Sequence, residues 1–377
     1  MVLGKSIYEL DNRLMLAAGN KITLGILKYF SVRGYNYIYI NEEGTEEVTP
    51  EDIISYPVLL QASSKLSLIL KSIKLNKFRN ISVEEAMKLI EEECILETNQ
   101  LFDVRSVMEA IVNDISYSAH KILNTLIPKS KSTYFIDHAI NTTILSTLIG
   151  YKYRLKKPEL LNLAVGAFLH DIGKIIIEQL EGHDDDQTAQ KLYREHPIFG
   201  YLMLQKCKVI SPMENQIVYQ HHENQDGTGF PSGHFGGNKP PTKYEVRDLK
   251  GQIYRLAEIC SVANAYDRMV LNPYDEEQLT PRDVIKKLIP MVGTILNKDI
   301  VKTLIQIVPI HPIGAYVKVV KCDDPSLINY YGIVAEINEG NLNKPIIYLM
   351  IDNNSKRIDP FKIDTSQFDK VKLELIL

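Results

Sequence analysis

The fold of this chain is decided by the stretch PELLNLAVGAFLHDIGK, residues 158–174. Its first part places apolar side chains at helical spacing and predicts a buried helix that ends at His170. Asp171 follows that histidine at once, and Gly173 and Lys174 come next. A histidine beside an aspartate is a weak signal by itself, so the prediction of a site depends on the other histidines of the chain.

Histidines gather around this stretch. The chain has nine, and six of them form one set on predicted helices or in a loop that follows them: His138, His170, His196, His221, His222 and His234. The helices expected here span Tyr134–Tyr151, Pro158–His170, His196–Cys207, Met213–His222 and Tyr254–Val270. The doubled histidine precedes Glu223 and the glycine-rich segment Asp226–Pro231.

Imidazoles and carboxylates together are natural ligands for Mn, Fe, Co or Zn, whereas Mg and Ca prefer oxygen. Asp171 can bridge two such ions, and two neighbouring ions neutralise charge on a phosphorus centre and its leaving oxygen. Lys174 lies one helical turn after His170, so it can face the same cavity and meet a phosphate oxygen. The sequence therefore predicts a metal site for phosphate esters. Cys94, Cys207, Cys260 and Cys322 are far apart, which argues against a disulfide framework or a thiolate zinc site.

The motifs His170-Asp171-Ile172-Gly173-Lys174 and His221-His222-Glu223, with Asp226-Gly227-Thr228-Gly229-Phe230-Pro231, resemble those of the HD-GYP family. Members of this family are metal-dependent phosphodiesterases that hydrolyse the bacterial second messenger cyclic di-GMP. The resemblance covers about residues 130–310. It implies that a metal-bridging hydroxide attacks cyclic di-GMP in line and gives linear pGpG, with GMP as a further product. Two divalent ions are implied, with Fe or Mn the usual metals and Zn permitted by the ligands.

The resemblance also assigns roles to single residues. Asp171 and Lys174 match the catalytic positions, and Lys174 matches the lysine that binds the substrate phosphate. The metal-ligand positions match His138, His170, Asp171, His196, His221 and His222. The family's signature loop beside the substrate matches Asp226, Gly227, Gly229, Phe230 and Pro231, where glycines allow backbone shapes closed to other residues.

The sequence departs from the family pattern at four positions. Phe230 replaces the signature tyrosine, and Tyr134 stands where three-metal members have a glutamate. Asn264 replaces a metal-binding aspartate; its amide oxygen can coordinate a metal but brings no negative charge. Asn272 precedes Pro273-Tyr274 where the family often has an arginine, so a substrate contact is missing there.

These departures leave two functions open. The first is a phosphodiesterase whose second ion is held weakly through Asn264. The second is a catalytically weakened domain that binds cyclic di-GMP as a non-catalytic effector or interaction module. Asp267, three residues after Asn264, is a less favoured candidate for a compensating ligand.

The chain is expected to be multidomain, because 377 residues exceed one ordinary core. The expected parts are a small α/β module at 1–100 (a possible sensory or regulatory module), a connecting helix at 101–128, an all-α HD-type domain at 129–308 and a β-rich extension at 309–377. In the first part, a helix at Leu24–Val32, a strand at Tyr37–Ile40 and a capping box at Ser82 and Glu85 are predicted. A last helix is expected at Pro281–Ile307, and strands at Ala315–Val320, Gly332–Ile337 and Pro345–Ile351.

Composition narrows the class of protein further. With 45% apolar and 24% charged residues the chain reads as a folded, cytoplasmic protein without a signal peptide or a membrane-spanning run. The formal net charge of −4 argues against binding of nucleic acid polymers. The connecting helix either packs on its own domain or forms a homodimer.

Overall fold

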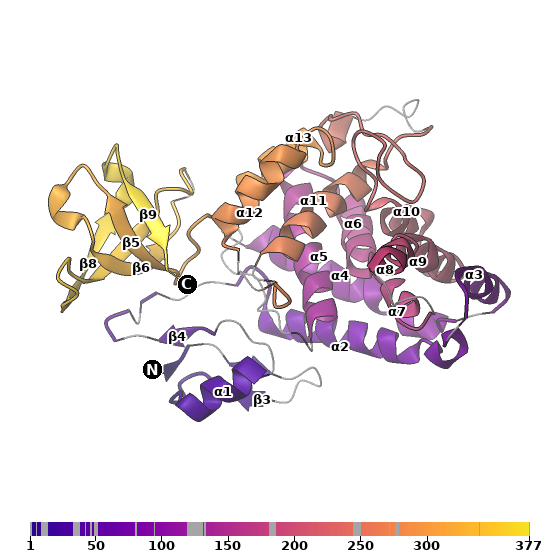
Figure 1. The fold of residues 1–377 in the computed structure, drawn as a ribbon, viewed down its shortest axis with the longest axis horizontal. Helices are drawn as coiled ribbons and strands as arrows, with labels where there is room; N and C mark the ends of the chain where they lie inside the picture. Colours follow the sequence, from indigo (N-terminus) through magenta and orange to yellow (C-terminus); the bar gives the residue numbers. More distant parts are fainter. Residues whose placement is uncertain are drawn as a thin grey trace.

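The computed structural model describes residues 2–4, 6–8, 14–32, 38–41, 43–45, 47–48, 52–79, 81–93, 95–118, 131, 133–180, 186–243, 250–270, 272–275, 279–338 and 340–376. Figure 1 shows a large group of packed helices, with a β-sheet built from the C-terminal residues at its side. The predicted combination of a helical domain and a β-rich C-terminal part is confirmed at this level.

The described helices are α1 Leu24–Val32, α2 Tyr56–Ser72, α3 Val83–Glu92, α4 Val104–Tyr117, α5 Tyr134–Lys152, α6 Lys157–Leu169, α7 Lys174–Ile177, α8 Asp186–Tyr193, α9 His196–Gln205, α10 Pro212–Gln220, α11 Arg255–Met269, α12 Pro281–Leu288 and α13 Lys298–Ile305. The described strands are β1 Val2–Leu3, β2 Ile7–Tyr8, β3 Leu14–Leu16, β4 Ile40–Asn41, β5 Tyr316–Lys321, β6 Tyr331–Glu336, β7 Ile346–Ile351, β8 Arg357–Asp364 and β9 Lys372–Leu375.

Helix α5 is the centre of the helical domain. Its side chains are buried almost without interruption from Ile136 to Gly150, because α6 and α11 pack against it. Helix α6 in turn contacts α4 and α10, so α5 and α6, whose residues are mostly buried, lie innermost. A single apolar core runs from Ile53 to Val308, and α2 and α3 of the expected N-terminal module therefore share it.

One predicted helix was wrong. Instead of a continuous helix over 281–307, the chain forms α12, a short 3-10 turn at Ile289–Met291 and then α13. Pro290 cannot continue the backbone hydrogen bonds of α12, and Gly293 has a φ of 86°. Asn297 then starts α13, because its side chain accepts the backbone N–H groups of Asp299 and Ile300.

The C-terminal residues form one antiparallel sheet with the strand order β8-β7-β6-β5-β9. Three of its strands were predicted within a residue or two, whereas β8 and β9 were missed. Strand β8 reads RIDPFKID, and its charged residues and Pro360 hide the strand pattern. Both missed strands are at the edges of the sheet, where polar residues and proline are tolerated.

The N-terminal part has little regular structure in its described residues. Strand β1 pairs with β4 and β2 pairs with β3, each as an antiparallel ribbon. Helix α1 has the predicted bounds, and Ser82 and Glu85 form the predicted capping box. The strand expected at Tyr37–Ile40 is observed only at Ile40–Asn41, and Tyr37 lies outside the described residues.

The predicted connecting helix is observed as α4, and residues 119–130 lie outside the described part of the chain. The apolar face of α4 is buried against α2 and α6 of the same chain. A homodimer through residues 101–128 stays a prediction. Contrary to expectation, Lys157–Ile177 is long and apolar enough to cross a membrane by length and composition, although 78% of its most apolar window is buried in the protein core.

Candidate metal centre

Four helices bring the predicted metal ligands together. His138 lies in α5, His170 and Asp171 follow the end of α6, and His196 is the first residue of α9. His221 and His222 follow the end of α10. Because α6 packs against both α5 and α10, and α10 packs against α9, these helix ends meet at one point of the core.

Asp171 is at the middle of this cluster. Its Oδ2 atom lies 3.5 Å from His138 Nε2 and 3.4 Å from His170 Nε2. Its Oδ1 atom lies 3.2 Å from His196 Nε2 and 3.5 Å from His221 Nε2. Each carboxylate oxygen thus faces two imidazoles, one pair on each side.

The potential ligand atoms fall into two groups that share this carboxylate. One group is His138, His170 and Asp171, and the other is Asp171, His196, His221 and His222. Within each group all the ligand atoms lie within 4.8 Å of one another. Each group could hold a divalent cation, and Asp171 would be a ligand in both groups.

Three of the histidines are oriented by nearby backbone carbonyl groups. The Nδ1 atoms of His170, His196 and His221 lie 2.7, 2.6 and 2.8 Å from backbone carbonyl oxygens three residues earlier in the chain. A ring that donates from Nδ1 keeps a lone pair on Nε2, which is the atom that faces Asp171. The same tautomer is therefore set at three positions.

His138 is oriented by a carboxylate from another helix. Its Nδ1 atom lies 2.6 Å from Oδ2 of Asp267, a fully buried residue of α11. The sequence suggested Asp267 as a compensating ligand, but the structure places it behind His138 as a hydrogen-bond acceptor. Such an outer carboxylate fixes the imidazole and raises its basicity.

Burial favours the neutral form of four of the imidazoles. It lowers the pKa of His196 and of His221 to about 4, and it also lowers the pKa of His170. The pKa of His222 lies well below its usual value because of burial and the neighbouring histidines. For Asp171, burial opposes ionisation, but His170 and Lys174 outweigh it and hold the pKa of the carboxyl well below its ordinary value. Neutral imidazoles around an ionised carboxylate are the protonation states that bind a cation.

The cluster also has inner polar atoms with no hydrogen-bond partner among the described residues. These atoms are Nε2 of His138 and of His170 and Oδ1 of Asp171. Leaving such buried groups unpaired is costly, and a bound cation would satisfy all three. The donor set therefore fits the divalent metals that its sequence motifs predict.

Asn264 lies in α11 one turn before Asp267 and is 3% exposed. Its Oδ1 atom has no hydrogen-bond partner among the described residues, as expected of a group kept for a ligand. The ring of Tyr134, at the position where some family members have a glutamate, stacks parallel to His138 with 5.6 Å between ring centroids.

Lys174 is the first residue of α7 and pairs with Oδ2 of Asp171. Gly173 makes this position possible, since a Cβ atom there would lie 2.0 Å from the carbonyl oxygen of His196. Helix α9 thus packs directly on the backbone of Gly173. This main-chain contact brings His196 close to the carboxylate of Asp171.

The signature loop lies on the open side of the cluster. The ring of Phe230 stacks on His222 with 4.6 Å between centroids and 16° between planes. Gly229 is required by close packing, because a Cβ atom there would lie 2.3 Å from the amide nitrogen of Asn224. Gly227 has a φ of 77°, and Pro231 follows a cis peptide bond. Asp226 is exposed, and its carboxylate accepts the backbone N–H of Thr228 at 3.0 Å, so in this structure it shapes the turn.

Two residues at the site were missed by sequence reasoning. The hydroxyl of Tyr193, the last residue of α8, lies 3.3 Å from Nε2 of His222. Arg268 donates from Nη1 to the same hydroxyl at 2.8 Å. No motif marks either residue, since they come from segments 75 positions apart in the sequence.

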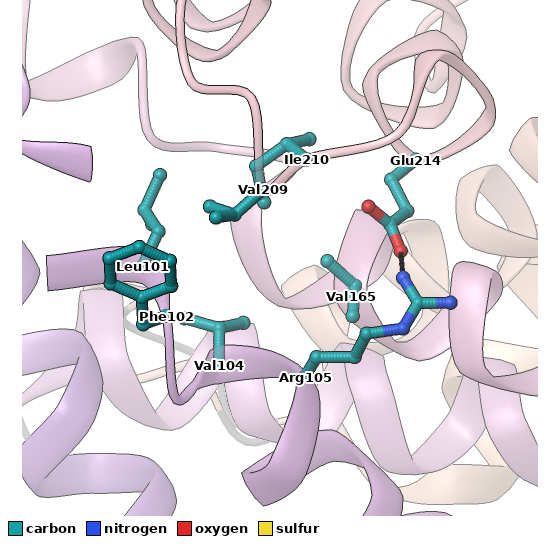
Figure 2. A pocket seen from close by; sticks show the side chains of 8 residues that line it. All are labelled: Leu101, Phe102, Val104, Arg105, Val165, Val209, Ile210 and Glu214. Atoms are coloured by element: carbon teal, nitrogen blue, oxygen red, sulfur yellow. Dashed lines mark hydrogen bonds and ion pairs between the residues drawn. The ribbon is translucent and has the colours of Figure 1, made fainter. Parts of the chain in front are cut away.

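A separate cavity of about 250 Å³ lies beneath α4, α6 and α10. Figure 2 shows its apolar wall and the ion pair between Arg105 and Glu214 at one side. Its lining residues are Leu101, Phe102, Val104, Arg105, Val165, Val209, Ile210 and Glu214, and none of them belongs to the histidine cluster.

A protein-family model described as "HD domain" matches residues 121–243. The centre of this chain is thus similar to HD domains. The match includes all six residues at the predicted ligand positions from His138 to His222, whereas Asn264 lies beyond it.

Curated relatives carry the comparison further. Cyclic di-GMP phosphodiesterase PdeB of Borreliella burgdorferi is 27% identical over 62% of this chain and 56% of its own length. Cyclic di-GMP phosphodiesterase PA4108 of Pseudomonas aeruginosa is 23% identical over 65% of this chain and 56% of its own length. The chain thus spans little more than half the length of these relatives. Together with the match to the HD-domain model, these relatives confirm the predicted resemblance to the HD-GYP family.

Among solved structures, the chain is similar to Bd1817, described as a "HDG"Y"P" protein from Bdellovibrio bacteriovorus. The two are 20% identical, with 81% of this chain and 94% of the other covered at a TM-score of 0.45.

Proposed function

We propose that this HD domain protein is a metal-dependent phosphodiesterase that hydrolyses cyclic di-GMP to pGpG, with GMP as a further product. The observation that carries the proposal is the pair of ligand groups that share Asp171. Divalent ions bound there, with Fe or Mn favoured and Zn permitted, would supply Lewis-acid charge and a nucleophile at neutral pH. The relatives named as cyclic di-GMP phosphodiesterases support the choice of substrate.

The protein's own residues have distinct tasks in this reaction. His138, His170, His196, His221 and His222 would hold the ions together with Asp171, and Asn264 would contribute its amide oxygen. Lys174, which is half-buried beside Asp171, would bind an oxygen of the reacting phosphate. The ring of Phe230 covers His222 and limits access of water from the loop side.

A second function is favoured by one observation. Asn264 puts a neutral amide at a position where the family has a carboxylate, so the second ion would be held more weakly. The alternative is a non-catalytic effector that binds cyclic di-GMP in the same site. A cytoplasmic location remains a prediction for both functions.

A turnover assay separates the two functions. The full chain is loaded with Mn or Fe, its metal content is measured, and cyclic di-GMP hydrolysis is followed by chromatography of pGpG and GMP. We expect both metal and product. A fully metallated protein that yields no product would exclude the enzyme, and tight binding without turnover would establish the effector.

The variant Asn264→Asp tests the weak position directly. Restoring a negative charge should raise both metal occupancy and the hydrolysis rate, if residue 264 is a ligand. Metal content per chain and kcat are measured on the same preparation. If neither quantity changes, Asn264 is not a ligand.

A further inference from the structure

A cation without an ion pair stands beside the metal centre. In the described part of the chain, the guanidinium of Arg268 pairs with no carboxylate, and its side-chain hydrogen bond goes to the hydroxyl of Tyr193. Lys174, by contrast, is paired with Asp171. The charge of Arg268 is therefore available to an anion.

The guanidinium is held close to the predicted reaction site. A single hydroxyl, that of Tyr193, separates it from Nε2 of His222, with 2.8 Å on one side and 3.3 Å on the other. Two cations lie near the same ring, since Lys174 Nζ is 5.2 Å and Arg268 Cζ is 5.5 Å from its centroid. Cation–π contacts of this kind restrict the side chain of Arg268 before any ligand arrives.

The substrate offers an anion that the metal centre does not use. A cyclic dinucleotide has two phosphodiester groups, each with one negative charge, and only one can be cleaved at a time. The other must lie a few ångströms from the reacting phosphate. Asn272 cannot bind it as an arginine would; instead its side-chain amide donates to the carbonyl oxygen of Arg268 at 3.1 Å.

We propose that Arg268, positioned by Tyr193, binds the phosphate of the cyclic dinucleotide that is not being cleaved. Guanidinium groups suit this task because their planar fork can donate two hydrogen bonds to one phosphate. The assignment deepens the proposed function and rests on it. Arg268 would set the preference for dinucleotides over small phosphodiesters, and Tyr193 would act as its positioning residue.

The test compares two substrates on the manganese-loaded full chain. Cyclic di-GMP has a second phosphate, whereas bis(4-nitrophenyl) phosphate has none. In Arg268→Gln we expect the KM for cyclic di-GMP to rise about tenfold with little change in kcat. The ratio of kcat/KM for cyclic di-GMP over the small diester should fall by a similar factor. Arg268→Lys, which keeps the charge without the fork, should recover part of the loss.

Two further variants complete the comparison. Tyr193→Phe keeps the ring and removes the hydroxyl, so it should show a smaller rise in the same KM. Lys302→Gln removes an exposed positive charge from α13 and serves as the matched control, with unchanged kinetics on both substrates.

Binding is measured in parallel with a hydrolysis-resistant phosphorothioate analogue of cyclic di-GMP. Arg268→Gln should bind it about tenfold more weakly than the wild type. An unchanged dissociation constant, or equal losses on both substrates, would overturn the role of Arg268. Failure of the proposed function looks different, because the wild type itself would then neither bind the analogue nor hydrolyse cyclic di-GMP.

Discussion

Two buried polar regions of the helical part of the chain differ in how their hydrogen bonds are satisfied. Beneath the signature loop, Oε1 of Glu258 accepts from Gln225 at 2.6 Å and from Asn297 at 3.2 Å. In the histidine cluster, the inner nitrogens of His138 and His170 have no partner among the described residues. The first region is satisfied by protein groups, whereas the second needs a cation.

The first region connects the loop after α10 to helices α11 and α13. Gln225 belongs to the loop segment, Glu258 to α11, and Asn297 caps α13. The side-chain oxygen of Gln225 also accepts the backbone N–H of Asn238 at 3.0 Å, so both arms of the loop are held to the helices. The comparison teaches that buried polar residues mark a ligand site when their inner atoms are left without protein partners.

The largest expected effect comes from Asp171→Asn, which breaks the cluster at the residue that both ligand groups share. Losing the charge should remove most bound metal and lower the rate of cyclic di-GMP hydrolysis by roughly 100- to 1000-fold or more. Metal content is measured by mass spectrometry, and Asp324→Asn in the C-terminal part is the control. Normal metal content in Asp171→Asn would contradict the shared ligand.

Asp267→Asn should have the next largest effect, because it weakens the orientation of His138 without removing a ligand. Loss of an outer carboxylate typically lowers metal affinity by about 10- to 100-fold. The dissociation constant for Mn is measured by competition with a chelator.

Asp137→Asn is the matched control for this variant. Asp137 neighbours His138 in the sequence but accepts from the hydroxyl of Thr133, so its loss should leave metal affinity unchanged. Equal dissociation constants for Asp267→Asn and the wild type would show that Asp267 has no part in metal binding.

The smallest effect is expected from Glu258→Gln, in the buried region where Gln225 and Asn297 donate to Glu258. Burial raises the pKa of Glu258 to about 7, so between pH 4.5 and 7 the folded chain holds a proton that the unfolded chain releases. The contribution of Glu258 to the free energy of unfolding is therefore fully present at low pH and is lost as the pH rises through 7. The glutamine keeps the accepting oxygen, and the melting temperature at pH 8 should rise by roughly 2 °C or more.

This variant is compared with the wild type at pH 5 and at pH 8 by thermal unfolding. The difference in melting temperature should be larger at pH 8. Glu374→Gln, at an exposed position of β9, is the control and should show no such dependence. A gain of the same size at both pH values would contradict a buried carboxyl with a raised pKa.

The sequence predicted the members of the metal cluster because their motifs are local. His170-Asp171 and His221-His222 are adjacent pairs at helix ends, and the apolar periodicity placed those ends within a residue or two. The pairing of His138 with Asp267 could not be predicted, because 129 positions separate the two residues. The contact between Tyr193 and Arg268 was missed for the same reason, and α8 is too polar to be recognised by periodicity.

The packing at Gly173 has a consequence for engineering. The backbone of residue 173 touches the start of α9 so closely that the crossing of α7 and α9 sets where His196 stands. A designer who transplanted only the ligand side chains onto another helical scaffold would lose that spacing. The transferable unit is the crossing itself, with glycine at the point of contact.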